Sequence, residues 1–179
     1  MIPPGPETRR RLLEALSLKT LPRAGWERAG VSKPESVAAH SWGVAWLVLV
    51  LCPEELDLET ALAIAVVHDL AEVRVGDITP HDGIDPREKT RLEREAFADM
   101  VDPLPRAERL LALFEAYGDS PEGRFVQVCD KLDMALQAAW YEADDHTLDL
   151  SEFVDSALAK LASGKLAELV RSCDEPREP

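Results

Sequence analysis

The spacing of prolines against a helical hydrophobic period is the feature that most restricts how this chain can fold. Apolar residues recur at helical spacing over most of the sequence, and no alternating β-branched run indicates a strand. The prolines fall between these segments or in their first turns, where a helix tolerates them. We therefore predict an all-α bundle of about six to seven helices, over residues 6–19, 35–51, 57–74, 86–101, 104–117, 121–144 and 149–171.

The chain has 179 residues, a length that fits one domain with a sizeable core. We expect that domain to cover residues 1–172 and to be followed by a flexible C-terminal tail, 173–179. The longest apolar run, 42–51, is too short to cross a bilayer. The segment 1–6 lacks the basic start and apolar stretch of a signal peptide, so a cytoplasmic location is expected.

The formal net charge is −14, from 34 acidic and 20 basic side chains. A surface of that sign repels polyanions, so nucleic acid polymers and membranes are not expected as partners. A small phosphorylated substrate remains possible, because a bound cation and a few arginines can reverse the potential inside a cleft. The alternative, that the charge serves only solubility, is equally consistent with the composition.

The stretch 61–73 is apolar nearly all round and should form a central helix, yet His68 and Asp69 interrupt it. Burying a carboxylate beside an imidazole without a strong partner costs several kcal/mol in order of magnitude. A metal ion would supply that partner, and Glu72 lies on the same side as His68 one turn later. Taken alone, the dipeptide favours the alternative of a buried ion pair with a structural role.

Two further polar residues sit in apolar surroundings, His40 near the start of one predicted helix and Asp130 within another. Each alone has a simpler interpretation, a hydrogen-bonded core histidine and an aspartate paired with Lys131 or Arg124. Together with His68 and Asp69, they make two imidazoles and two carboxylates on three helices. That set suits one divalent cation, Mn, Co, Mg, Zn or Fe, with positions left open for water and substrate.

The order His, His-Asp, Asp resembles the HD superfamily of metal-dependent phosphohydrolases, and most closely its 5′-deoxynucleotidase branch. The resemblance runs from about residue 10 to 145. The phrases that carry it are Leu21-Pro22-Arg23-Ala24-Gly25-Trp26, Pro34-Glu35-Ser36-Val37-Ala38-Ala39-His40-Ser41, His68-Asp69-Leu70-Ala71-Glu72, Gly76-Asp77-Ile78-Thr79-Pro80 and Asp130-Lys131-Leu132-Asp133-Met134. It implies a helical fold, a phosphatase activity in nucleotide metabolism and a homodimer.

The resemblance also implies roles for individual residues. The metal ligands are His40, His68, Asp69 and Asp130. Glu72 acts on the attacking water, and Asp77 contacts the substrate near its sugar. The remaining candidates bind substrate: Arg23 or Arg28 the phosphate, Trp26 the sugar or base, and Lys89 and Glu115 the rim of the cleft. From the residues alone, Glu72 could instead be an exposed carboxylate at a helix end, and Asp77 a turn or cap residue after Gly76.

The chain departs from the family pattern at three positions. Ala39 stands where relatives usually carry an acidic residue beside the first ligand, and Gly123 and Gln127 replace an alanine and a lysine. The first change removes a carboxylate that could orient His40, which could lower metal affinity or change metal preference. No expected ligand is lost, nor is Glu72, so activity is expected to survive.

These observations predict metal-dependent hydrolysis of the phosphate monoester of 5′-(deoxy)nucleoside monophosphates, releasing nucleoside and phosphate. One alternative is an HD hydrolase acting on a nucleoside triphosphate, a cyclic nucleotide or an alarmone. Another is a non-catalytic helical module with a structural metal. A metal-dependent rate would separate the enzymes from the inert site.

Overall fold

The computed structural model describes residues 5–161 and 165–171, and within these ranges the chain is helical with no strand, which confirms the all-α prediction. The predicted tail at 173–179 lies outside the described residues. The elements are α1 (Pro6–Ala15), η1 (Leu16–Lys19), α2 (Ala24–Arg28), α3 (Val37–Leu51), α4 (Leu58–Val67), α5 (Glu72–Val75), η2 (Pro80–Asp82), α6 (Pro86–Val101), α7 (Ala107–Glu115), α8 (Pro121–Asp144), α9 (Ser151–Leu161) and α10 (Lys165–Arg171). None of these helices combines the length and apolarity needed to span a membrane.

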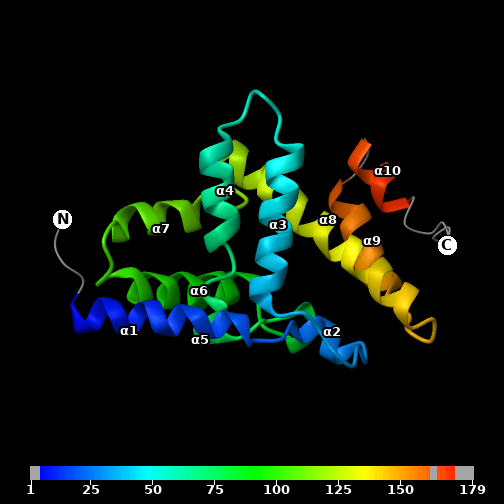
Figure 1. The fold of residues 1–179 in the computed structure, drawn as a ribbon, viewed down its shortest axis with the longest axis horizontal. Coiled ribbons are helices and arrows are strands. Elements are labelled where there is room, and N and C mark those ends of the chain that lie inside the picture. The colour runs from blue at the N-terminus through cyan, green and yellow to red at the C-terminus, as the bar shows by residue number, and fades with distance from the viewer. Residues whose placement is uncertain (1–4, 162–164, 172–179) are drawn as a thin grey trace.

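The long helix α8 organises the bundle, as Figure 1 shows. It packs against α3 and α4 along one part of its length and against α9 along another. One apolar core, with Ile64 and Phe97 at its centre, lies where α3, α4, α6 and α7 meet α8. A second core forms around Trp26 and Leu132, between α8, α9 and α10. The polar residues of interest lie near the junction of these two cores.

The described residues contain more helices than the six or seven predicted, because the predicted helix 57–74 is divided, the short helix α2 was missed, and α9 and α10 are described separately. The predicted helix 57–74 ends at Val67, and α5 begins only at Glu72. The His68 imidazole bonds to the Ala65 carbonyl at 2.8 Å, and the turns that follow use i→i+3 backbone bonds instead of i→i+4. A side chain that competes for a backbone carbonyl can end a helix in this way.

The other two differences concern the last predicted helix and the segment between the first two. The predicted helix 149–171 begins at Ser151 and is seen as α9 and α10 on either side of residues 162–164, which are not described. Helix α2 has five residues, too few to show a hydrophobic period.

Three well-defined helices carry the four predicted ligands to one place. His40 lies in the first turns of α3, whose first turn is capped by the Ser36 hydroxyl accepting from the Ala39 amide at 3.2 Å. His68 and Asp69 directly follow α4, and Asp130 lies within α8. Because α3, α4 and α8 pack on one another, these side chains converge.

The short helix α5, which begins with Glu72, is held in place by Arg74. The Arg74 guanidinium pairs with Glu14 of α1, Nε to Oε1 at 2.6 Å, and with Asp99 of α6. A charge network that joins three helices restrains a four-residue segment that has little helical stability of its own. The position of Glu72 is therefore set by tertiary contacts.

Candidate metal centre

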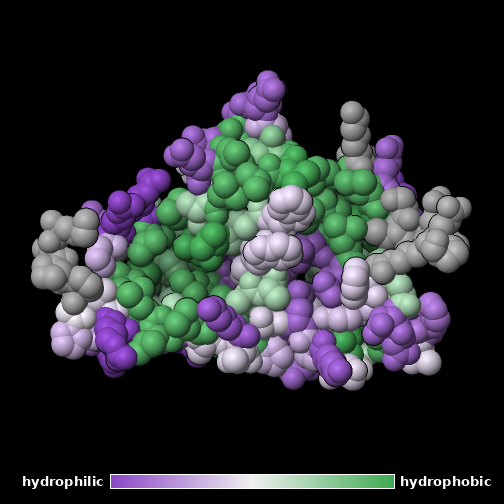
Figure 2. Space-filling view, viewed as in Figure 1, coloured by the Kyte–Doolittle hydropathy of each residue, from purple (hydrophilic) through white to green (hydrophobic). Residues whose placement is uncertain are grey.

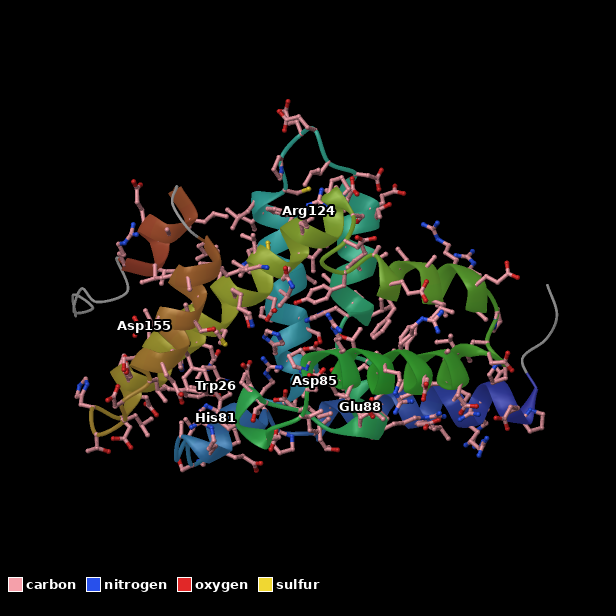
Figure 3. All side chains as sticks on the ribbon, turned by 180° about the vertical axis from the view of Figure 1, so that it is seen from behind. Trp26, His81, Asp85, Glu88, Arg124 and Asp155 are labelled. Atoms are coloured by element: carbon pink, nitrogen blue, oxygen red, sulfur yellow. The ribbon has the colours of Figure 1, made fainter. Side chains whose placement is uncertain are left out.

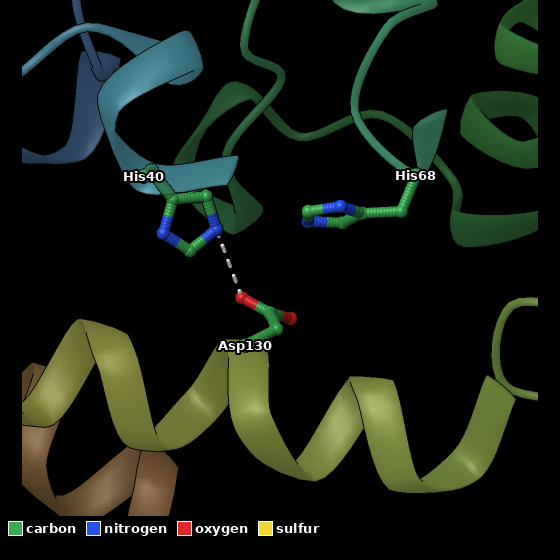
Figure 4. A group of neighbouring side chains, drawn as sticks. All are labelled: His40, His68 and Asp130. Carbon is green, nitrogen blue, oxygen red and sulfur yellow. Dashed lines mark ion pairs between the residues drawn. The ribbon is translucent and has the colours of Figure 1, made fainter. Parts of the chain in front are cut away.

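The four predicted metal ligands form one cluster between α3, α4 and α8. The Nε2 atom of His40 lies 3.3 Å from Oδ1 of Asp130 and 3.6 Å from Oδ2 of Asp69. That same Asp69 oxygen is 3.2 Å from Nε2 of His68. Figure 4 shows the two imidazoles and the Asp130 carboxylate facing a shared space, each from a different segment. The structure thus brings together four residues that lie up to 90 positions apart in sequence.

Both imidazoles are oriented through their Nδ1 atoms. His40 Nδ1 lies 2.8 Å from Oδ2 of Asp133, and His68 Nδ1 lies 2.8 Å from the carbonyl oxygen of Ala65. Both acceptors require Nδ1 to carry the hydrogen when the ring is neutral, which leaves the Nε2 lone pair free. Neither Nε2 atom has a hydrogen-bond partner although both are buried.

This arrangement fits a divalent cation. Two buried and unpartnered nitrogens face two carboxylate oxygens, and imidazole with carboxylate is a donor set common to Zn, Fe, Co and Mn sites. A hydrogen bond to the second ring nitrogen is the usual way in which proteins orient a ligating histidine. His40, His68 and Asp130 also lie close enough to one another for their donor atoms to share one ion.

The pKa values of His40 and Asp69 are shifted by the charged groups packed around them. Burial and Arg23 lower the pKa of His40, but the carboxylates of Asp130 and Asp133 outweigh them and raise it to about 9. Burial raises the pKa of Asp69, yet the charges of His68 and Arg23 hold it well below its usual value. A cation would replace the His40 proton as the positive partner of these carboxylates.

Glu72 is 3% exposed and lies in the cleft beside the four clustered side chains. The alternative that it is an exposed carboxylate at a helix end is therefore wrong. Its Oε2 atom is buried without a hydrogen-bond partner. Burial, together with the charges of Asp69 and Asp77, raises the pKa of Glu72 to about 10. The positive charge of a divalent cation nearby would offset the negative charges of Asp69 and Asp77 and so favour the ionised form of Glu72.

Asp77 and Arg23 contact each other at the start of α2, beside the clustered side chains. Oδ2 of Asp77 accepts the backbone N–H of Ala24 at 2.9 Å, so this carboxylate caps the start of α2. Its Oδ1 atom lies 3.5 Å from the Arg23 guanidinium, which is also 3.4 Å from Oδ2 of Asp69. Asp77 thus acts as a cap, but for a helix 53 positions away in sequence and not for the local turn after Gly76 that the alternative described.

A cleft with a volume of about 740 Å³ opens beside the clustered side chains. Lys89 and Glu115 line it, where the Lys89 ammonium donates to the Ile78 carbonyl at 2.7 Å and Glu115 accepts from Arg94 at 2.6 Å. In Figure 3, Trp26 of α2 and His81 of η2 lie toward the same end of the molecule, and both line this cleft.

The two remaining predicted substrate contacts, Trp26 and Arg28, have partners outside the cluster. Trp26 is only 2% exposed; its Nε1 atom donates to Glu35 at 3.0 Å, and its ring packs on Phe153 with centroids 4.2 Å apart. Arg28 pairs with Glu152 and lies over the Phe153 ring. Both side chains therefore build the wall of the cleft on the side of α9.

Sequence reasoning missed two residues that contact the ligands. Tyr117 donates its hydroxyl to Oδ2 of Asp130 at 2.6 Å, and its ring lies 5.1 Å from that of His68. Asp133 is the partner of His40 described above. Asp133 could have been found, because it lies three residues after Asp130 and therefore on the same side of α8. Tyr117 follows α7 in a loop, and no sequence pattern marked it.

Comparison with known proteins agrees with this geometry. The HD domain family model matches residues 15–169. The chain is 37% identical over 177 residues to 5′-deoxynucleotidase HDDC2 of Bos taurus, covering 94% of this chain and 86% of that protein. It is 40% identical over 151 residues to 5′-deoxynucleotidase hdd1 of Schizosaccharomyces pombe, covering 79% and 76%. A crystal structure of a Pyrococcus horikoshii protein superimposes with a TM-score of 0.77 at 33% identity, covering 94% of this chain and 99% of that one.

The chain therefore belongs to the HD domain family. The relatives it matches over most of their length carry the name 5′-deoxynucleotidase.

Proposed function

We propose that this protein is a metal-dependent 5′-deoxynucleotidase, which hydrolyses the phosphate monoester of 5′-deoxynucleoside monophosphates to nucleoside and phosphate. The observation that carries the proposal is the set of unpartnered buried atoms at the base of the cleft. Nε2 of His40, Nε2 of His68 and Oε2 of Glu72 are all buried without hydrogen-bond partners. The names of the relatives support the same substrate class.

In this proposal His40, His68, Asp69 and Asp130 hold one divalent cation. The chemistry supplied by that cation, when bound, is polarisation of a phosphoryl oxygen and a lowered pKa of a water molecule. The cluster is buried on its protein side and opens to the cleft on the other. A site of this kind leaves room for water and a phosphoryl group, which a closed structural site does not.

Glu72 accepts the proton of the attacking water, because it is the carboxylate beside the cluster that has no partner of its own. Arg23 is favoured over Arg28 for the phosphate. Its guanidinium lies beside Asp69, whereas Arg28 is engaged with Glu152 at the α9 side.

Asp77 fixes the start of α2 and faces the sugar, and Lys89 and Glu115 line the entrance. Trp26 supports the substrate through the wall that it forms with Phe153.

The test is phosphate release from a panel of nucleotides after chelation and addition of one metal at a time. The panel holds 5′-deoxy- and 5′-ribonucleoside monophosphates, a 3′-monophosphate, a deoxynucleoside triphosphate and a cyclic nucleotide. We expect metal-dependent release from the 5′-deoxynucleoside monophosphates. Release only from the triphosphate or the cyclic nucleotide would keep the metal site and replace the substrate. Metal binding without release from any member would favour the structural site.

We also propose that the protein is a homodimer that buries the outward face of α3. Trp42 is 70% exposed and Trp46 is 52% exposed, and hydrophobic side chains gather over α3 and α4 in Figure 2. Two copies that each carry a formal charge of −14 repel one another over most of their surfaces. The sequence of α3 contains no Asp, Glu, Lys or Arg, so this face can be buried without that repulsion.

Light scattering coupled to gel filtration tests the dimer. We expect twice the chain mass for the wild type and a monomer for Trp42→Glu, because a carboxylate in each half of the interface would be buried without a partner. A wild-type monomer at micromolar concentration, or a Trp42→Glu dimer, would contradict the proposed face.

The cytoplasmic location and the single domain over residues 1–172 stay predictions. Fractionation of cells would test the location, and limited proteolysis would test the domain.

A further inference from the structure

The two histidines of the cluster are supported in different ways. His68 uses the carbonyl of Ala65 in its own preceding helix, a partner that side-chain substitution cannot remove. His40 of α3 uses the Asp133 carboxylate of α8, from the opposite helix, at 2.8 Å. His40 is 1% exposed, so no water can replace this partner without rearrangement. The orientation of the His40 ring therefore depends on a contact between two helices.

Gly43 is the feature of α3 that makes this contact possible. It lies three residues after His40, inside a fifteen-residue helix, where glycine is less favourable than alanine. A Cβ atom at this position would overlap the Asp133 carboxylate and lie 2.8 Å from its Cγ. The Asp133 side chain thus occupies the space that any other residue at position 43 would fill.

The His40 ring also belongs to a second group of possible metal ligands, formed with Glu35 and Asp133. A cation in that group would occupy the Nδ1 side of the ring. The Nδ1 atom on that side already has Asp133 at hydrogen-bonding distance, and Glu35 already accepts from Trp26 at 3.0 Å. The Nε2 atom on the other side is buried without a partner. The unsatisfied side of His40 is therefore the one that faces His68, Asp69 and Asp130.

We propose that Asp133 is a positioning residue that holds His40 through its Nδ1–H so that Nε2 faces the cation, and that Gly43 provides the space for it. The carboxylate that orients His40 in this chain therefore comes from α8, since Ala39 has none. A charged acceptor on Nδ1–H also makes the ring a stronger electron donor at Nε2. This inference rests on the proposed metal site but not on the proposed substrate.

The test measures Co²⁺ binding to the full chain by titration, with the visible absorption spectrum of the bound ion as a second readout. For Asp133→Ala we expect Co²⁺ affinity to fall by about 10–100-fold, with a changed spectrum because His40 is no longer fixed. Asp133→Asn, which keeps an acceptor oxygen without the charge, should recover part of the loss. Asp144→Ala, an exposed carboxylate of the same helix, is the matched control and should bind as the wild type does.

Gly43→Ala, made in the wild type and in Asp133→Ala, completes a double-mutant cycle. The cycle compares the effect of one substitution in two backgrounds, so its result does not rest on how well a single variant folds. In the wild type, Gly43→Ala should weaken Co²⁺ binding, because the new methyl group displaces the Asp133 carboxylate. In the Asp133→Ala background, the same change should leave Co²⁺ affinity unaltered and raise Tm, since the space is then free and alanine favours the helix.

The outcomes distinguish a failure of the metal site from a failure of the role of Asp133. A wild-type chain that binds no Co²⁺ would overturn the metal site together with this inference. A wild type that binds Co²⁺, with an Asp133→Ala variant that matches its affinity and spectrum, would overturn the role of Asp133 alone. Effects of Gly43→Ala that are the same in both backgrounds would show that Gly43 does not act through Asp133.

Discussion

Replacing Glu72 by glutamine is expected to lower kcat for a 5′-deoxynucleoside monophosphate by a factor of about 10²–10⁴, the range typical of a lost general base. The amide keeps the volume of the side chain but cannot accept the proton of the attacking water. Because Glu72 is not among the four clustered ligands, the metal content should not change. Initial rates at saturating metal and substrate measure the effect, and elemental analysis of the purified variant measures the metal.

The matched control for this variant is Glu95→Gln, an exposed glutamate on α6 that pairs with Arg91. It should retain the wild-type kcat and KM, since exposed pairs of this kind contribute little. A Glu72→Gln enzyme that keeps more than about a tenth of the wild-type kcat would exclude the role of base, since such a loss is worth more than tenfold. Loss of activity together with loss of metal would instead make Glu72 part of the cation site.

The sequence predicted most of the fold because most of its helices are long and clearly bounded. The helix 86–101 is found at the predicted residues, and α8 runs from Pro121 to Asp144 as predicted. The break after Val67 could not be predicted from hydrophobic period, because the apolar residues Leu70, Ala71 and Val73 continue the pattern beyond His68 and Asp69. It arises from the bond between His68 and the Ala65 carbonyl, which becomes apparent only when the ring orientation is known.

For the site, the clustering of polar residues could be predicted from their chemistry, whereas their partners depend on packing. Four polar residues in apolar surroundings were sufficient to predict a cluster, since an unpartnered buried charge is costly. The partners of these residues were harder to predict, because Tyr117 approaches Asp130 from a loop and Asp133 approaches His40 from a different helix. The resemblance assigned Trp26 to the sugar or base, but its ring is almost fully buried between Tyr141 and Phe153. Side-chain exposure of this kind depends on tertiary packing that no local pattern records.

Replacing Asp130 by asparagine is expected to abolish the stabilisation of the protein by metal. For the wild type, a cation at a hundred times its Kd adds about 2.7 kcal/mol to the free energy of unfolding, which raises Tm by roughly 5–10 °C in a domain of this size. Asparagine is close in shape and can still accept from Tyr117, so the packing of α8 should persist. It has lost the negative charge that faces His40 Nε2 at 3.3 Å, and a neutral amide oxygen is a weaker ligand.

Thermal unfolding with and without Mn²⁺ or Co²⁺ measures this effect, with Asp144→Asn at the exposed end of the same helix as the matched control. The control should show the full shift in Tm on adding metal, and Asp130→Asn should show almost none and no phosphate release. An Asp130→Asn variant that retains the full shift would place the cation elsewhere. Without metal, the variant should lose some stability, because the buried His40 loses one of its carboxylate partners and keeps only Asp69 and Asp133. The difference between the two shifts therefore isolates the contribution of Asp130 to metal binding from its contribution to the fold.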